Sequence, residues 1–384
     1  MANPEPRHQI SLGDQSKKEV AKRFKNKTNL LKRRARSIER KTARRRAIHK
    51  ARRKELNLLH FGVSKEEARE DIKLMSATRR YERVEAPEVF SFNENPEGVI
   101  QFINKLENLF IEKRKTCVML KKIKTIDYGA IVSLLSIMVQ FKAKNIKFNG
   151  NIPKNENTKN ILIKSGFFKN LALEFKDEDQ YQINDGGKNE IITHAGKLVD
   201  SELGDAIIQS ASKTIWGEER RCQGVQRVLI ELMMNTNNHA ANRVKGEKHW
   251  WLHVNHDEQS GIVGFAFVDF GVGIFKSLND KPNTSKFYNY LSKIAKLLKH
   301  GDNAEILKLM LNGEFHQTVT GKYFRGKGLP GIADVQKRNQ ITSLKIVTND
   351  AYASLDDDVF QKLDHSFSGT YVYWEIRRDN GNCK

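Results

Sequence analysis

The chain has 384 residues, of which 39% are apolar and 29% are charged, and its formal net charge is +21. A chain of this length can build two domains, each with a core of its own. No apolar run is long enough to span a bilayer, and no signal-peptide-like apolar segment follows the basic N-terminus, so we expect neither a membrane anchor nor secretion. The three cysteines, Cys117, Cys222 and Cys383, are far apart and odd in number, which predicts a reducing, cytoplasmic compartment and argues against a structural zinc site.

The first 60 residues carry most of the positive charge, since 20 Lys and Arg against 5 Asp and Glu give +15 and leave +6 for the rest. No Pro or Gly interrupts residues 15–60, and apolar residues recur near helical spacing. Residues 1–62 are therefore predicted to form a basic arm that is helical or partly disordered. Such a segment is typical of proteins that bind the phosphate backbone of DNA or RNA. The residues expected to contact nucleic acid are Lys32, Arg33, Arg34, Arg36, Arg44, Arg45, Arg46, Arg52 and Arg53.

Two other interpretations of the arm remain open, a polybasic tail in solvent and a docking arm for an acidic protein partner. Phe24 is the arm's one aromatic residue before position 61, so base stacking is not indicated. The arm also lacks the bulky apolar face that inserts into a membrane surface. Nucleic acid is the favoured partner, and association with the nucleoid would follow from it.

A helix and a linker are predicted over residues 63–85. Ser64 to Glu67 has the form of a capping box, which begins a helix that continues to about Ala77. Pro87 and several acidic residues make residues 78–95 typical of a linker.

Residues 86–178 alternate between strand and helix patterns, which predicts a small α/β domain. Helices are expected after Asn95-Pro96, after Asp127 and over 157–164, with strands at 116–120 and 146–148. The pattern resembles a STAS-like domain, the fold of anti-anti-sigma factors. The resemblance rests on Ile126-Asp127 before a helix, then a strand, a Pro-containing loop and Gly166-Phe167 at a helix end.

Regulated members of that family carry a phosphorylatable Ser directly after the Asp, whereas this chain has Tyr128 there. The resemblance therefore does not imply control by serine phosphorylation at that position. We expect the domain to be a structural or signal-receiving element that docks a protein partner and has no catalysis of its own.

The second half of the chain predicts a larger α/β domain over residues 186–384. Helices are expected at 200–211 and 218–241, antiparallel strands with alternating burial at 249–254 and 264–269, and further strands at 344–347 and 370–376. The insert 275–322 shows two apolar patterns with helical spacing, which predicts a helical lid.

Three stretches of this half resemble the N box, G1 box and G2 box of the GHKL ATPases, in that order. The superfamily includes gyrase, the 90-kDa heat-shock chaperones, mismatch-repair ATPases and histidine kinases. The stretches are Glu231 to His239, Phe267 to Ile274 and Arg325 to Ile332, and a weaker fourth match is Ser368-Gly369-Thr370. The resemblance implies an α/β sandwich with a mixed sheet that binds ATP and Mg²⁺.

The residue types suit that chemistry. Asn235 supplies a neutral oxygen ligand for Mg²⁺, and Glu231, one helical turn away, supplies a carboxylate that orients or activates water. Asp269 is the acceptor for the adenine amino group, and Gly271 and Gly273 let the backbone approach the base closely.

Backbone N–H groups at the glycines Gly326, Gly328 and Gly331 are expected to bind phosphate at a helix start. Lys322 or Lys327 would neutralise the phosphates, or else be surface charge. The other residues assigned to the nucleotide are Asn238, His239, Ile274, Leu329 and Thr370. For His239 a capping or core role is equally consistent with the sequence.

Three functions follow from the resemblance. The first is a slow Mg²⁺-dependent ATPase whose nucleotide state controls the engagement of nucleic acid or a protein, in the manner of dimeric family members, so a homodimer is expected. The second is a serine/threonine protein kinase of the anti-sigma type, and the third is a nucleotide-gated switch without hydrolysis. A histidine kinase is disfavoured, because no phosphoacceptor histidine followed by an acidic residue precedes the domain.

Overall fold

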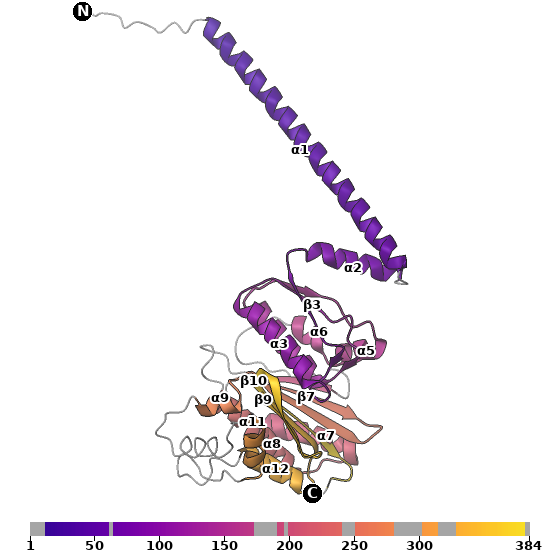
Figure 1. Cartoon of the computed structure of the whole chain (residues 1–384), viewed down its shortest axis with the longest axis vertical. Helices are drawn as coiled ribbons and strands as arrows, with labels where there is room; N and C mark the ends of the chain where they lie inside the picture. The colour runs from indigo at the N-terminus through magenta and orange to yellow at the C-terminus, as the bar shows by residue number, and fades with distance from the viewer. Residues whose placement is uncertain are drawn as a thin grey trace, which may run out of the picture. The chain divides into compact units, whose positions relative to one another are not determined.

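The computed structural model describes residues 12–60, 64–172, 190–195, 199–239, 250–279, 302–313 and 328–380 (Figure 1). The chain divides into two compact units, Met1–Arg79 and Arg80–Lys384. Across the described ranges, no helix is both long and apolar enough to cross a membrane.

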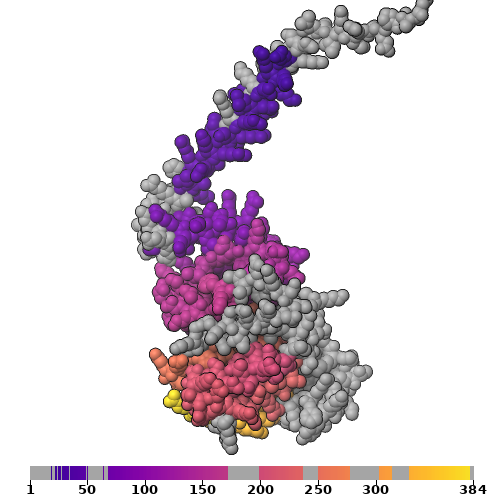
Figure 2. All heavy atoms as spheres, turned by 180° about the vertical axis from the view of Figure 1, so that it is seen from behind, coloured from indigo at the N-terminus to yellow at the C-terminus, as the bar shows by residue number. Residues whose placement is uncertain are grey.

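The first unit consists of two helices, α1 (Leu12–His60) and α2 (Lys65–Ala77). The predicted helix of the basic arm is thus present, and it runs without interruption for 49 residues. The α1 side chains that the structure describes are exposed, as the indigo atoms of Figure 2 show. The second helix begins where the capping box predicted, and Ala68 N donates to Ser64 O at 2.9 Å.

The second unit begins with a small α/β module, residues 80–172. Its parallel sheet has the order β1-β3-β5 (Glu82–Glu85, Thr116–Met119, Phe148–Gly150), and β2 (Val89–Phe90) pairs with β4 (Thr125–Ile126). The helices are α3 (Pro96–Ile111), α4 (Tyr128–Ala143), α5 (Glu156–Lys164) and α6 (Phe167–Ala172). Asn95 and Asp127 cap α3 and α4 as the sequence predicted, since the Asn95 side chain accepts from Gly98 N and the Asp127 side chain accepts from Ala130 N.

The linker predicted over residues 78–95 is wrong at β1 and β2. Val84 and Phe90 are buried in the core of the module, and β1 forms a parallel ladder with β3. Strands of four and two residues show too little of a two-residue period to stand out in a sequence.

The second layer is a five-stranded antiparallel sheet of order β6-β7-β8-β10-β9. In that order its strands are Glu190–Ala195, Trp250–Asp257, Ile262–Asp269, Val359–Arg377 and Thr342–Ser354. The described helices of this region are α7 (Ser201–Trp216), α8 (Gln223–His239), α9 (Ile274–Asn279), α11 (Asn303–Leu311) and α12 (Gly328–Lys337). The fold is therefore mixed α/β, with parallel strands in the module and antiparallel strands in the large sheet.

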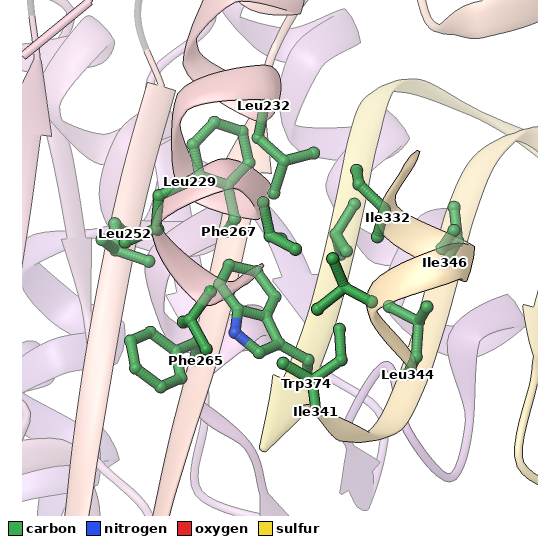
Figure 3. Packing of buried hydrophobic residues seen from close by; sticks show 14 of the residues in the cluster. Leu229, Leu232, Leu252, Phe265, Phe267, Ile332, Ile341, Leu344, Ile346 and Trp374 are labelled. Carbon is green, nitrogen blue, oxygen red and sulfur yellow. The ribbon is translucent and has the colours of Figure 1, made fainter. Parts of the chain in front are cut away.

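The large sheet is buried on both faces. Phe265 and Phe267 of β8 pack with the helices around Trp374, and Figure 3 shows Leu229, Leu232 and Ile332 in the same cluster. The alternate residues of β8, Ala266 and Val268, point to the other face and pack against the module. Figure 1 shows the module and the helices α8, α11 and α12 on opposite sides of the sheet. The predicted alternation of buried and exposed residues is therefore wrong for β7 and β8, because a second layer covers the face that was expected to meet solvent.

The insert 275–322 is only partly described. Helix α11 is present there, but Ala304, Leu307 and Leu311 are buried in the same core as α8 and α12. This part of the insert is a fixed piece of the core, so the lid prediction is wrong for Asn303–Leu311. Residues 280–301 and 314–322 lie outside the described residues.

The cysteines also differ from the prediction. Cys222 is disulfide-bonded, whereas Cys117 is free and buried, and Cys383 lies outside the described residues.

Candidate functional site

The first and third predicted stretches meet where α8 and α12 pack together. A Cβ atom placed on Gly328 would lie 3.3 Å from Asn235 Nδ2 and 3.4 Å from Glu231 Oε2. Position 328 therefore lies within contact distance of both side chains. Glu231 and Asn235 are half-buried, and neither has a hydrogen-bond partner among the described residues. A carboxylate, an amide and the start of a helix therefore converge, and the two side chains are unpaired within the described part of the chain.

A second contact shows how the two helices run. A Cβ atom on Gly331 would lie 2.8 Å from Arg227 Nη2, so Arg227 of α8 lies over the first turn of α12. Positions 227 and 231–235 of α8 thus face positions 331 and 328 of α12, which makes the helices antiparallel. The N-terminal N–H groups of α12, at the positive end of its dipole, lie beside Asn235.

Asp269 ends β8 and is paired in register with Thr370 of β10. Its Oδ1 accepts a hydrogen bond from Gly271 N at 2.9 Å, and Thr370 donates to it from both side chain and backbone. Burial raises the pKa of Asp269 from 3.8 to about 6, against the opposing effect of these hydrogen bonds. The carboxylate is therefore mostly ionised at neutral pH and can accept a hydrogen bond.

The turn after Asp269 is held by two residues that the sequence reasoning missed, Thr348 and Asn349 of β9. Ile274 N donates to Thr348 Oγ1 at 3.0 Å, Phe275 N donates to Asn349 Oδ1 at 2.9 Å, and Asn349 Nδ2 donates to Val272 O at 2.9 Å. Gly273 has φ of 78°, and a Cβ atom there would overlap the Asn349 amide. The available signal was weak, because Thr348 and Asn349 lie in a strand that also contains Lys345 and Asp350.

The Ser368-Gly369-Thr370 stretch lies directly against Asp269. Gly369 has φ of 152°, and a Cβ atom there would overlap the backbone oxygen of Asp269. Thr348 Oγ1 also donates to Gly369 O at 3.2 Å. These contacts require glycine at position 369 and bring Thr370 to Asp269.

The two clusters lie on the same side of the sheet. Asp269 follows Phe265 and Phe267 in the alternation of β8, and Thr370 precedes Val372 and Trp374 in that of β10; these four apolar residues pack with the helices. The structure thus places Glu231, Asn235 and Gly328 at one point of the helical face, and Asp269, Gly271, Gly273 and Thr370 at another.

The remaining predicted residues divide into described and undescribed positions. Half-buried Ile274 and buried Leu329 lie in the first turns of α9 and α12. Lys322, Gly326 and Lys327 lie outside the described residues, as do the side chains of Asn238 and His239. On α1, Lys32, Arg33, Arg36, Arg44, Arg45 and Arg46 are exposed, whereas the side chains of Arg34, Arg52 and Arg53 lie outside the described set.

Metal ligands are sparse in the part of the chain that the structure describes. It contains no group of three or more His, Cys, Asp and Glu residues that could hold a metal ion. A single neutral amide oxygen at Asn235 suits Mg²⁺, which takes most of its ligands from substrate phosphates and water. In comparisons with known proteins, no family model, curated protein or solved structure matches this chain.

Proposed function

We propose that this chain is an ATP-binding protein of the GHKL type that hydrolyses ATP slowly with Mg²⁺. The observation that carries the proposal is the convergence of Gly328 on Glu231 and Asn235. Gly328 belongs to the stretch that resembles the G2 box, and Glu231 and Asn235 belong to the stretch that resembles the N box. More than 90 residues of sequence separate Gly328 from the other two. Their contact puts a phosphate-binding helix start beside a carboxylate and an amide.

The phosphate end of the ligand would lie at the start of α12. Its free N–H groups bind phosphate oxygens, and Asn235 holds Mg²⁺, which neutralises charge on the phosphates. Glu231 accepts a proton from the attacking water or orients it toward the terminal phosphorus. Lys322 and Lys327 are the proposed sources of further positive charge.

The adenine end of the ligand would lie at the ends of β8 and β10. The ionised Asp269 accepts a hydrogen bond from the amino group of adenine, and Thr370 orients that carboxylate. The flat base would lie against the backbone at Gly271, and Asn349 would hold the turn at Gly273 in place.

The basic helix α1 would supply the second partner. Its exposed cations suit the phosphate backbone of nucleic acid, and the nucleotide state of the domain would control whether α1 engages it. A kinase of the anti-sigma type that phosphorylates the module is less well supported. Tyr128 occupies the position where regulated STAS-like domains carry the phosphorylatable Ser. It stacks on His253 of β7 at a centroid distance of 4.0 Å, and its neighbours in α4 are buried.

Phosphate release from ATP by the purified protein tests this proposal, with and without added DNA or RNA. Glu231→Ala is the matched control, because it removes the carboxylate but keeps the ATP-binding residues. Nucleic-acid-stimulated release that disappears in Glu231→Ala is the expected result. Tight ATP binding with no release under any condition would instead favour the nucleotide-gated switch, and equal release by both proteins would point to a contaminating ATPase.

A further inference from the structure

The module touches the large sheet directly behind the candidate adenine end. Helix α4 packs against β7 and β8, and α3 packs against β10. Residues of the module and of the sheet share one buried cluster, which includes Phe92 of the module and Phe367 and Tyr371 of β10. The two layers therefore share a core across their interface and are not joined by surface contacts alone.

Phe92 is the module residue from which a series of ring contacts leads toward the candidate site. It stacks on Tyr371 at a centroid distance of 4.6 Å and meets Phe367 edge-on at 5.4 Å. Phe367 in turn meets Phe270 at 6.0 Å. Phe270 directly follows Asp269, and Tyr371 directly follows Thr370. Three aromatic contacts thus connect Phe92 to the residues that flank the proposed adenine-binding pair, directly at Tyr371 and through Phe367 at Phe270.

The position of Phe92 is fixed by a buried carboxylate. Asp127 accepts hydrogen bonds from Ser91 Oγ at 2.7 Å and from Asn93 N at 3.1 Å, one residue to either side of Phe92. The Asn93 side chain then accepts from the Tyr371 hydroxyl at 3.2 Å. The turn that presents Phe92 is therefore attached both to its own module and to β10.

Polar contacts from α3 of the same module hold the neighbouring part of β10. Glu97 of α3 pairs with His365 and accepts a hydrogen bond from Asp364 N at 3.2 Å, and Asn104 donates to Ser366 O at 3.0 Å. In this part of β10 the register with β9 shifts before Phe367 and again before Thr370. An irregular strand has fewer ladder hydrogen bonds of its own, so these contacts from α3 help to fix its course into Thr370.

We propose that the module positions the adenine end of the nucleotide site, with Phe92 as the positioning residue. Removing its ring leaves a cavity beside Phe367 and Tyr371. The backbone that carries Thr370 then loses direct support, and Phe270, next to Asp269, loses support through Phe367. The phosphate end lies between α8 and α12, on the side of the sheet that faces away from the module. The sheet separates it from Phe92, so it should keep its geometry. This inference rests on the proposed function for its ligand, but the positioning itself concerns the protein alone.

The test compares Phe92→Ala with Phe102→Ala in the full chain. Phe102 is a buried phenylalanine of the same module, and its ring meets Phe90 within the module at 5.2 Å. Both variants lose one buried ring, and Phe92 has the direct ring contacts to β10. Hydrogen exchange of the amides in 269–275 and 369–371 is measured without nucleotide. Calorimetry then gives the Kd and the stoichiometry for ATP and for GTP with Mg²⁺.

Phe92→Ala is expected to speed exchange in both segments about tenfold while Phe102→Ala leaves it unchanged. It should also weaken ATP binding about tenfold at full stoichiometry and reduce the preference for ATP over GTP. General destabilisation would lower the stoichiometry and leave the Kd and the preference unchanged. If Phe92→Ala does not fold, Phe92→Leu replaces it and should show the same pattern with a smaller amplitude.

Wild-type exchange rates in the Phe92 variant, or equal increases in both variants, would overturn the inference. So would an unchanged Kd for ATP in a folded Phe92 variant. If the wild-type protein binds no nucleotide, the proposed function is wrong, and the exchange measurement alone then decides whether Phe92 positions the two segments.

Discussion

The two faces of the five-stranded sheet are both buried, but they differ in what covers them and in how their polar groups are used. On the helical face, Glu231 and Asn235 have no hydrogen-bond partner among the described residues, and Asp269 keeps a carboxylate in a poorly solvated place. On the module face, Asp127 and the Tyr371 hydroxyl are hydrogen-bonded to module residues, whereas both ring nitrogens of the buried His253, which stacks on Tyr128, have no partner among the described residues.

This difference bears on which face supports the structure and which face is suited to bind a ligand. Buried polar groups that are fully paired contribute to one defined arrangement, whereas unpaired or desolvated groups cost stability and are retained where a ligand completes them. The shared buried core gives the module face the character of a permanent interface, and half-buried Glu231 and Asn235 make the helical face the candidate for ligand binding. Three substitutions test that contrast.

Gly129→Ala should have the largest effect on stability, because a Cβ atom at this position of α4 would overlap Cε2 of the buried Tyr371. Alanine favours a helix over glycine, so any loss must come from the contact between the module and the sheet. We expect the free energy of unfolding to fall by about 2 to 3 kcal/mol. Denaturant unfolding monitored by tryptophan fluorescence measures this change.

Gly204→Ala in α7 is the matched control. No atom lies within 4 Å of a Cβ atom placed there, so this variant should gain about 0.5 to 1 kcal/mol from helix propensity. Equal stabilities of the two alanine variants would show that α4 does not sit on Tyr371.

Val268→Ala distinguishes a covered face from an exposed one. Val268 is fully buried against the module, so losing two methyl groups should cost roughly 2 kcal/mol. The alternating pattern expected from the sequence would make this position solvent-facing and the substitution nearly neutral. Val359→Ala, at an exposed position of β10, is the control and should change stability by less than about 0.5 kcal/mol. If Val268→Ala does not change stability, the module does not cover this face of the sheet.

Local signals predicted much of the fold because they are complete within a few residues. Asn95 and Asp127 are capping residues whose side chains bond to the backbone three positions later, so the starts of α3 and α4 were predicted correctly. The sequence could not show that the module covers the large sheet. That depends on Phe92 meeting Tyr371, a contact between residues far apart in the chain. The burial of α11 in the core depends on long-range packing in the same way.

The residues of the candidate site differ in how visible they are in the sequence. Gly328 and Asp269 lie in short patterns of distinctive composition, which drew attention to them. Asn349 supports the Gly273 turn from a strand 76 residues further on, and one polar residue in a strand has many explanations. Residues that bind through a motif can be found from sequence, whereas residues that hold the motif in place need the fold.

Asp269→Asn tests the cost of the site itself. The pKa of Asp269 is higher in the folded protein, about 6, than its ordinary value of 3.8. The folded state therefore binds this proton more tightly, so the stabilisation from the carboxyl is complete below pH 3.8 and is lost as pH rises through about 6. Asparagine cannot ionise, so at pH 7 the nucleotide-free variant should be more stable than the wild type by on the order of 1 kcal/mol, and the two should converge near pH 4.

The same variant should bind ATP at least about tenfold more weakly, because an amide NH₂ cannot accept the hydrogen bond of the adenine amino group. Thermal unfolding from pH 4 to 8 measures the first effect, and calorimetry with ATP at pH 7 measures the second. Gain of stability together with loss of affinity is the pattern of a group retained for binding at a cost to the fold. If the variant is more stable but binds ATP with unchanged affinity, Asp269 is not part of the nucleotide site. If the variant loses both stability and ATP affinity, Asp269 is a structural residue of β8, and the contrast between the two faces of the sheet does not depend on it.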